Sequence, residues 1–158
     1  MVRKTTKKTG TKSTKTKKKE KIVLTKGKKK SAVARARIKI VKGNGEYRVN
    51  KKKVDLIEPE IARKEMLLPV WIASDVLGEK VINNLDIDVN VQGGGFMGQA
   101  EAVKVAVAKG IVKITESEDL KNAYLNYDRS ILVDDIRRKE PKKYMRKGAR
   151  ARFQKSFR

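Results

Sequence analysis

The sequence predicts an α+β domain that carries a strongly basic arm at each end. Residues 85–92 alternate apolar and polar side chains, which is typical of a strand with one buried face. A glycine-rich turn follows at 93–98, and from Ala100 to Ile111 the apolar residues recur at helical spacing. We therefore expect a strand, a tight turn and a helix at the centre of the core.

Charge divides the chain into three parts. Residues 1–30 carry a net charge of +13 and residues 137–158 carry +10, whereas the middle holds 16 acidic and 16 basic side chains. The composition predicts a disordered basic arm over 1–26, because its Lys, Thr, Ser and Gly residues bury too little apolar surface to offset chain entropy. It also predicts a globular domain over 27–136 and an extended basic tail over 137–158. Arms of this kind usually bind a polyanion.

The ordered chain is expected to begin near Lys30. Before it, residues 22–24 form an apolar patch in the arm, which we interpret as an anchor onto the domain or onto a partner. The lysine runs of the arm are also compatible with a nuclear import signal or a solubilising tail. We favour contact with a nucleic acid, because the other end of the chain is equally basic.

Residues 31–40 predict the first strand of the domain. Alanine and isoleucine occupy one face and basic residues the other, as in a half-buried antiparallel sheet. The segment Lys42-Gly43-Asn44-Gly45 predicts a hairpin, and its partner strand contains Tyr47 and Val49. Residues 50–53 predict a second turn.

Two helices are expected before the central strand. Pro59 suits the first turn of a helix, and Pro69 is expected to end or kink it. The second helix then runs over residues 70–77, with Trp71 as a core anchor and Gly78 as its C-terminal stop.

A short helix is expected after the central helix. Ser117 can cap its N-terminus, and acidic residues follow in its first turn. Its buried side would be Leu120, Ala123, Tyr124 and Tyr127, and residues 131–133 would close the domain. The aromatic residues could stack on bases, but single aromatic residues at helical spacing are more often core residues.

The glycine turn allows several interpretations. We expect Gly93, Gly94, Gly95 and Gly98 to form a structural turn, because glycine adopts positive φ without a Cβ clash. The same glycines match the G-x-G-x-x-G pattern of a dinucleotide site, yet no second parallel strand is predicted after the helix. A P-loop is excluded, since Gln99-Ala100 stands where Lys-Ser/Thr is needed. Backbone amides presented to an RNA phosphate at the helix N-terminus are a further possibility.

The chain contains neither cysteine nor histidine. This excludes disulfides, thiolate nucleophiles and cysteine-ligated zinc, and it removes the commonest general base. We therefore predict no enzyme, no metal and no cofactor. No apolar run approaches the roughly 20 residues of a membrane span, and no apolar stretch follows the basic N-terminus as in a secretory signal. A soluble, cytoplasmic protein without a membrane partner is expected.

The composition changes abruptly at Asp134. Pro141 and Gly148 disfavour a continuous helix, and the 11 cations of residues 137–158 would repel one another in isolation. Aromatic residues are spaced among them, and arginine suits both bidentate phosphate contacts and stacking on exposed bases. An extended arm that lies between RNA segments fits these facts.

Four blocks of the sequence resemble the small-subunit ribosomal protein S-nine family, in its archaeal or eukaryotic version. They are Gly27-Lys-Lys-Lys-Ser-Ala-Val-Ala-Arg35, Gly43-Asn-Gly45, Val91-Gln-Gly-Gly-Gly-Phe-Met-Gly-Gln-Ala100 and Gln154-Lys-Ser-Phe-Arg158. The resemblance covers residues 26–158 in order. It implies a two-layer sandwich of the ribosomal S-five domain-two type, bound to ribosomal RNA and neighbouring proteins in the head of the small subunit. It also implies a tail that reaches toward P-site tRNA.

The basic residues of the first strands and of the tail are expected to contact ribosomal RNA, although a solvated face is the alternative for those on the strand. The expected RNA-binding residues are Lys28, Lys29, Lys30, Arg35, Arg37, Lys39, Arg137, Arg138, Lys139, Lys142, Lys143, Arg146, Lys147, Arg150 and Arg152. By resemblance, the residues that contact tRNA are Lys155, Ser156 and Arg158.

We therefore expect a structural RNA-binding protein of the ribosome. Phosphate contacts should supply most of its affinity, and RNA shape most of its specificity. Two rival hypotheses are a DNA-compacting protein, which would need the same basic arms, and a nucleotide-dependent enzyme that uses the glycine turn.

Overall fold

The strand Leu85–Gln92 (β5) lies in the middle of a five-stranded sheet in the computed structural model, which describes residues 21–41, 43, 45–152 and 156. The other strands are β1 (Ile22–Lys29), β2 (Ala32–Ile40), β3 (Tyr47–Val49) and β4 (Lys52–Lys53). Their order is β1-β2-β5-β3-β4, and all pairs are antiparallel except β3 with β5. The structure is an α+β fold, as predicted.

The domain begins earlier than predicted. Residues 22–29 form β1, which pairs with β2 along its whole length. The expectation that the ordered chain begins near Lys30 is therefore wrong, and the predicted boundary at 26/27 falls inside a strand. β1 is an edge strand whose outer face is exposed, so it can carry polar and basic residues. The strand pattern was therefore not recognised in the sequence. Residues 1–20 lie outside the described part of the chain.

The predicted hairpin between residues 31–40 and 47–49 is also wrong, because β5 lies between β2 and β3. β5 offers β2 eight paired residues, whereas β3 has only three. The connecting segment crosses the start of β5 instead: the Val41 amide donates to the Asn84 carbonyl at 2.7 Å, and the Gly45 amide donates to the Asn83 carbonyl at 2.7 Å. The turn predicted over 50–53 begins at Asn50 and Lys51, both with positive φ, and leads into β4.

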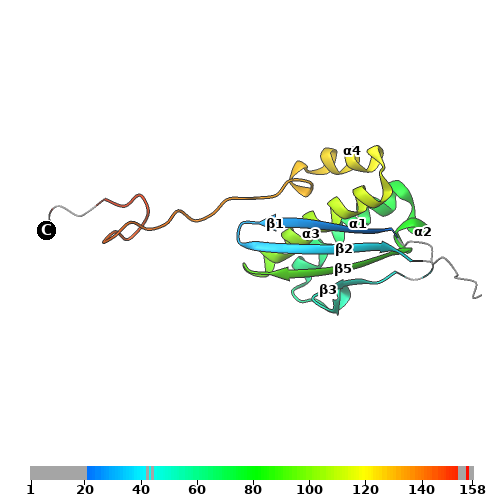
Figure 1. Ribbon diagram of the computed structural model, residues 1–158, viewed down its shortest axis with the longest axis horizontal. Coiled ribbons are helices and arrows are strands. Elements are labelled where there is room, and N and C mark those ends of the chain that lie inside the picture. The colour runs from blue at the N-terminus through cyan, green and yellow to red at the C-terminus, as the bar shows by residue number, and fades with distance from the viewer. Residues whose placement is uncertain (1–20, 42, 44, 153–155, 157–158) are drawn as a thin grey trace, which may run out of the picture.

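The helices cover one face of the sheet (Figure 1). They are α1 (Glu60–Leu77), α2 (Glu79–Ile82), α3 (Phe96–Thr115) and α4 (Glu118–Tyr127), and short 3-10 turns occupy Val54–Leu56 and Arg129–Ile131. The predicted central helix is confirmed as α3. The predicted cap of α4 is confirmed too, since the Ser117 hydroxyl accepts from the Leu120 amide at 3.3 Å.

A single helix, α1, replaces the two helices predicted around Pro69. Proline removes one helical hydrogen bond, but α1 continues because Ala62, Met66, Pro69 and Ala73 recur on one buried face. The Tyr124 hydroxyl of α4 donates to the Pro69 carbonyl at 2.7 Å and so joins the two helices at this point. Gly78 ends α1, as predicted.

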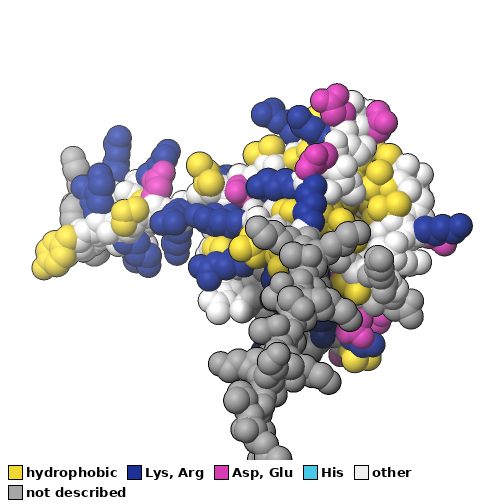
Figure 2. Space-filling model, turned by 45° about the vertical axis from the view of Figure 1, so that its right-hand side comes forward, with side chains coloured by type: hydrophobic (Ala, Val, Ile, Leu, Met, Phe, Trp, Pro, Cys, Tyr) yellow, Lys and Arg dark blue, Asp and Glu magenta, His cyan; other side chains and the backbone are white. Residues whose placement is uncertain are grey.

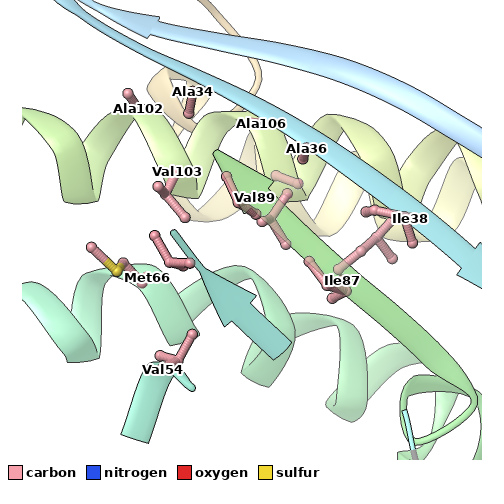
Figure 3. Close-up of a cluster of buried hydrophobic side chains, with 14 of the residues drawn as sticks. Ala34, Ala36, Ile38, Val54, Met66, Ile87, Val89, Ala102, Val103 and Ala106 are labelled. Atoms are coloured by element: carbon pink, nitrogen blue, oxygen red, sulfur yellow. The ribbon is translucent and has the colours of Figure 1, made fainter. Parts of the chain in front are cut away.

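The core lies between α3, α1 and the inner face of the sheet (Figure 3). Ala34, Ala36 and Ile38 of β2 and Ile87 and Val89 of β5 point toward α3 and α1. Two aromatic residues predicted to be buried are not: Trp71 is 47% exposed and Tyr127 is 62% exposed. Trp71 and Tyr127 lie on the solvent-facing sides of α1 and α4, because the buried faces of these helices are formed by other residues. In α4 the buried residues are Leu120 and Tyr124, and Tyr124 is fully buried.

Small residues let α3 lie close against β1 and β2. A Cβ atom on Gly27 of β1 would stand 2.5 Å from the Ala106 backbone nitrogen and closer still to the Ala102 carbonyl oxygen. A Cβ atom on Gly110 of α3 would overlap the Ile38 side chain. The glycine at position 27 is therefore required by close approach of the strand to the helix backbone.

We expect Gly27→Ala to destabilise the protein by about 1–3 kcal/mol or more, because the new methyl group meets backbone atoms that cannot turn aside. Gly98→Ala is the matched control: its Cβ would lie 3.8 Å from the Ala32 Cβ, an ordinary contact. Alanine should stabilise this first turn of α3 by up to about 1 kcal/mol. Denaturant unfolding of both variants measures the difference, and equal stabilities would contradict the close-approach argument.

Candidate nucleic-acid interface

A cationic groove lies where the C-terminal tail leaves the domain, beside the turn between β1 and β2. Its volume is about 760 Å³. It is lined by Lys28, Lys30, Ser31, Val33, Arg137, Arg138 and Lys139, which we call the tail-root groove. Five predicted RNA-binding cations from two distant parts of the sequence thus share one site. Lys and Arg side chains also gather along the tail itself (Figure 2).

Backbone hydrogen bonds hold the two segments of the groove together. Asp135 bridges to Lys29 in parallel register. The Lys30 amide donates to the Asp135 carbonyl at 2.9 Å, and the Asp135 amide donates to the Lys28 carbonyl at 2.9 Å. The tail therefore begins as a short extension of the sheet at the edge of β1.

Two carboxylates, Asp134 and Asp135, reinforce this attachment, and we call them the tail anchor. Asp134 Oδ1 accepts from the Lys28 amide at 3.1 Å and from Lys109 Nζ of α3 at 2.7 Å. Asp135 accepts from the Arg137 guanidinium through Nε at 3.0 Å and Nη2 at 2.7 Å, and from the Arg137 amide at 3.1 Å. These bonds join β1, α3 and the first residues of the tail.

The hydrogen bonds of the tail anchor shift proton affinities in the expected directions. The Arg137 side chain, followed by its amide, holds the pKa of Asp135 well below its usual range, although partial desolvation opposes this. Asp135 in turn raises the pKa of Arg137. Both groups therefore stay charged at any physiological pH.

Internal pairing divides the predicted cations of this region into two groups. Lys29 pairs with Glu101 and, at 3.8 Å, with Asp135, and Arg137 pairs with Asp135. The other groove cations are Lys28, Lys30, Arg138 and Lys139, and within the described chain none of them has a carboxylate partner. These four charges are available to an anionic ligand.

The predicted basic face of β2 is divided in the same way. Arg37 lies 3.5 Å from Asp88, and Lys39 lies 3.1 Å from Asp86, both on β5. Arg35 stands opposite Asn90 and has no ion-pair partner among the residues that the structure describes. The cross-strand partner thus decides which cation is neutralised within the sheet.

The remaining predicted cations lie along the tail, away from the groove. The described residues after Ile136 form no helix or strand, and they run away from the domain (Figure 1). They include Lys142, Lys143, Arg146, Lys147, Arg150 and Arg152. Arg150 Nη2 binds Glu140 Oε1 at 2.7 Å and lowers the pKa of that carboxyl. Ser156 is exposed, whereas Lys155 and Arg158 lie outside the described residues.

The glycine turn lies beside the groove, and its glycines are required by backbone conformation and close packing. Gly93 and Gly94 have φ angles of 77° and 69°. A Cβ atom on Gly94 would lie 3.0 Å from the Ala32 Cβ, and one on Gly93 would lie 2.7 Å from the Ser31 carbonyl oxygen. Gly95 is the N-cap of α3, and Gly98 lies inside that helix rather than in the turn.

Within the described residues, no dinucleotide-binding unit follows this turn. α3 leads into α4, and neither neighbour of β5 is a parallel strand that comes after α3. Across the described residues, no cluster of acidic side chains is arranged to hold a metal ion, and no helix is long and apolar enough to cross a membrane.

The sequence prediction missed the tail anchor and Lys109. Asp134 and Asp135 stand at the abrupt change of composition, which was the one signal that could have found them. Their role depends on β1, which was not predicted as a strand, and on which residue of α3 lies opposite them. Neither fact can be obtained from local patterns.

We expect Asp135→Asn to loosen the root of the tail at neutral pH, because the carboxylate bonds to Arg137 and Lys29 are lost. Faster hydrogen exchange at the Lys30 and Asp135 amides, measured by NMR, would report it. Since the folded-state pKa of Asp135 is depressed, its contribution is complete above the ordinary pKa of about 3.9 and is lost as pH falls through the folded value. Protection of these amides in the wild type should therefore persist below pH 4.

The control for this prediction is Glu140→Gln, which removes an exposed ion pair in the tail and leaves the bridge intact. Its Lys30 and Asp135 amides should exchange as in the wild type. If Asp135→Asn gave wild-type protection, the backbone bridge alone would hold the tail.

Comparison with known proteins agrees with this geometry and covers most of the chain. Residues 27–158 match the family model described as "Ribosomal protein S9/S16". The chain is 49% identical over 129 residues to "Small ribosomal subunit protein uS9" of Halobacterium salinarum, covering 81% of this chain and 92% of that protein. It is 47% identical over 138 residues to the protein of the same name from Methanothrix thermoacetophila, covering 87% and 99%. The chain therefore belongs to the ribosomal protein S9/S16 family, whose members are structural proteins and not enzymes.

Proposed function

We propose that this protein is a structural constituent of the small ribosomal subunit in the cytoplasm, where it binds ribosomal RNA in the head of the subunit. The names of its relatives support assignment to the small subunit, and the tail-root groove is the single observation that supports direct RNA contact. Four cations that have no carboxylate partner within the described residues converge there from two segments. Because each neutralised phosphate releases counterions, such a site supplies affinity without reading sequence.

The two-layer arrangement of sheet and helices supports assignment to the ribosomal S-five domain-two type. The basic segments at the two ends act as RNA-binding arms beside this sandwich and beside neighbouring head proteins. The alternative is a DNA-compacting protein, but the chain belongs to a family of ribosomal proteins, which favours RNA as the polyanion. RNase but not DNase should therefore release the protein from its complexes.

The tail gives this protein a second proposed partner, P-site tRNA. It leaves the domain in a direction held by the tail anchor, and 22 residues from Arg137 could extend roughly 70 Å at about 3.3 Å each. Phosphate contacts along it would hold the arm, so that Lys155, Ser156 and Arg158 at its tip meet the anticodon region of the tRNA.

Replacing Lys30, Arg138 and Lys139 with glutamine in the full chain should weaken binding to small-subunit ribosomal RNA. Removing one phosphate contact should make the slope of log K against log salt shallower by about 0.7–0.9. A change of about 2 is therefore expected for the three substitutions together, measured by titrations at several salt concentrations. Lys52→Gln, Lys80→Gln and Lys121→Gln together remove the same charge at exposed positions outside the groove, where these cations likewise have no carboxylate partner in the described chain. This control should keep a slope close to that of the wild type. Equal slopes for the two triple variants would refute the groove as an RNA site.

Deleting residues 155–158 should leave subunit assembly near normal but weaken binding of P-site tRNA. A charge-assisted contact contributes about 1.5–3 kcal/mol, so the loss should be partial. Filter binding of tRNA to purified variant subunits measures it, and sedimentation checks assembly. Four glycines in place of 155–158 keep the length of the tail and should behave like the deletion. Unchanged affinity and dissociation rate would mean that the tip has no tRNA contact.

A further inference from the structure

The outer face of the sheet, which none of the described helices covers, arranges its side chains in rows across β1, β2 and β5. The strand register sets these rows. Lys28 stands beside Val33 and Gln92, and Lys26 stands beside Arg35 and Asn90. The next two rows are Leu24 with Arg37 and Asp88, and Ile22 with Lys39 and Asp86.

Charge separates this face into two halves. In the two rows far from the tail root, Asp88 pairs with Arg37 at 3.5 Å, and Asp86 pairs with Lys39 at 3.1 Å and with Arg48 of β3 at 3.5 Å. In the two rows near the tail root there is no carboxylate. We call this half, made of Lys26, Lys28, Val33, Arg35, Asn90 and Gln92, the outer-face platform.

The platform is continuous with the tail-root groove. Lys28 and Val33 line that groove, and Val33 also lines a small hollow together with Arg35, Asn90 and Gln92. A ligand that binds its phosphates in the groove would therefore extend over the platform without reaching Asp86 and Asp88 on the ion-paired half of the sheet.

The platform offers two amide side chains to such a ligand. Asn90 and Gln92 are exposed, and neither side chain has a hydrogen-bond partner in the described part of the structure. Each amide both donates and accepts, as does the 2′-hydroxyl of RNA. The wide, shallow minor groove of an A-form helix presents rows of 2′-hydroxyls flanked by phosphates, and a flat sheet face can approach it.

We propose that the outer-face platform binds the minor groove of a double-stranded RNA segment, with Asn90 and Gln92 contacting 2′-hydroxyls and Lys26, Lys28 and Arg35 contacting the adjacent phosphates. This inference rests on the proposed RNA-binding function and adds the form of RNA that is recognised. It assigns the selection of RNA over DNA to two residues outside the groove.

The test uses the full chain, a blunt RNA duplex and a DNA duplex of the same sequence. The wild type should bind the RNA duplex more tightly, and Asn90→Ala with Gln92→Ala should lose most of that preference. An ordinary hydrogen bond changes affinity about twofold to twelvefold, so the ratio of dissociation constants should fall by at least about fivefold when both side chains are removed. The salt slope should stay at its wild-type value, since no charge is removed.

A matched control removes a neutral ion pair from the same two strands on the ion-paired half. Arg37→Gln with Asp88→Asn leaves the net charge unchanged and should keep the wild-type preference for RNA. Arg35→Gln should instead make the salt slope shallower by about 0.7–0.9. These two variants distinguish a contact at the platform from a general effect of altering the sheet.

A second measurement needs no variant. The wild-type protein should bind a fully 2′-O-methylated RNA duplex more weakly than the unmodified duplex, because the methyl group removes the hydroxyl donor. Equal affinities, an unchanged RNA preference in the amide variant, or an equal loss in the control would overturn the proposal. If the amide variant proved unfolded, the comparison of the methylated and unmodified RNA duplexes would test the proposal by itself. Failure of the RNA-binding function itself would appear separately, as an unchanged salt slope in the Lys30, Arg138 and Lys139 variant.

Discussion

The close approach of α3 to β1 and β2 holds the sheet, the turn beside it and the root of the tail in their places. Gly27 has no room for a Cβ atom because the backbone of α3 passes directly beside it. This contact holds an edge strand whose own sequence is mostly polar. Once β1 is fixed, its turn into β2 lies against Gly93 and Gly94, and its edge can pair with Asp135. The small residues of the core therefore position the tail-root groove, although none of them lines it.

Placement of carboxylates decides which of the many cations can act on a ligand. The middle of the chain is neutral in total, yet its acids are concentrated beside particular cations: Asp86 and Asp88 neutralise the β2 cations next to them. The tail anchor uses Lys29 and Arg137 for internal bonds. These acids stabilise the fold through ion pairs. Among the described residues, four cations without a carboxylate partner, Lys28, Lys30, Arg138 and Lys139, lie together in the tail-root groove. A count of charges would not separate these two roles.

Attachment of the tail through a sheet edge has a mechanical consequence. The bridge at Asp135 covers the end of an otherwise open edge strand, which protects it from pairing with another chain. It also gives the basic residues that follow a defined starting point and direction. An arm that begins from a rigid sheet loses less entropy on binding than one that begins from a free chain end. Under the proposed function, the fold and the arm therefore contribute to RNA binding together.

Elements whose pattern is local could be predicted from the order of residues. Alternation in residues 85–92, helical spacing after Ala100 and the cap at Ser117 are all present in the structure, and charge distribution with four sequence blocks led to the correct family. Contacts between distant residues decided the rest. The strand β1 exists because β2 and α3 cover it, β5 separates β2 from the predicted partner β3, and α1 passes through Pro69 because its buried stripe continues. The groove also depends on contacts between distant residues, since the hydrogen bond between Lys28 and Asp134 joins positions 106 residues apart. Local sequence patterns carry no information about such a pairing.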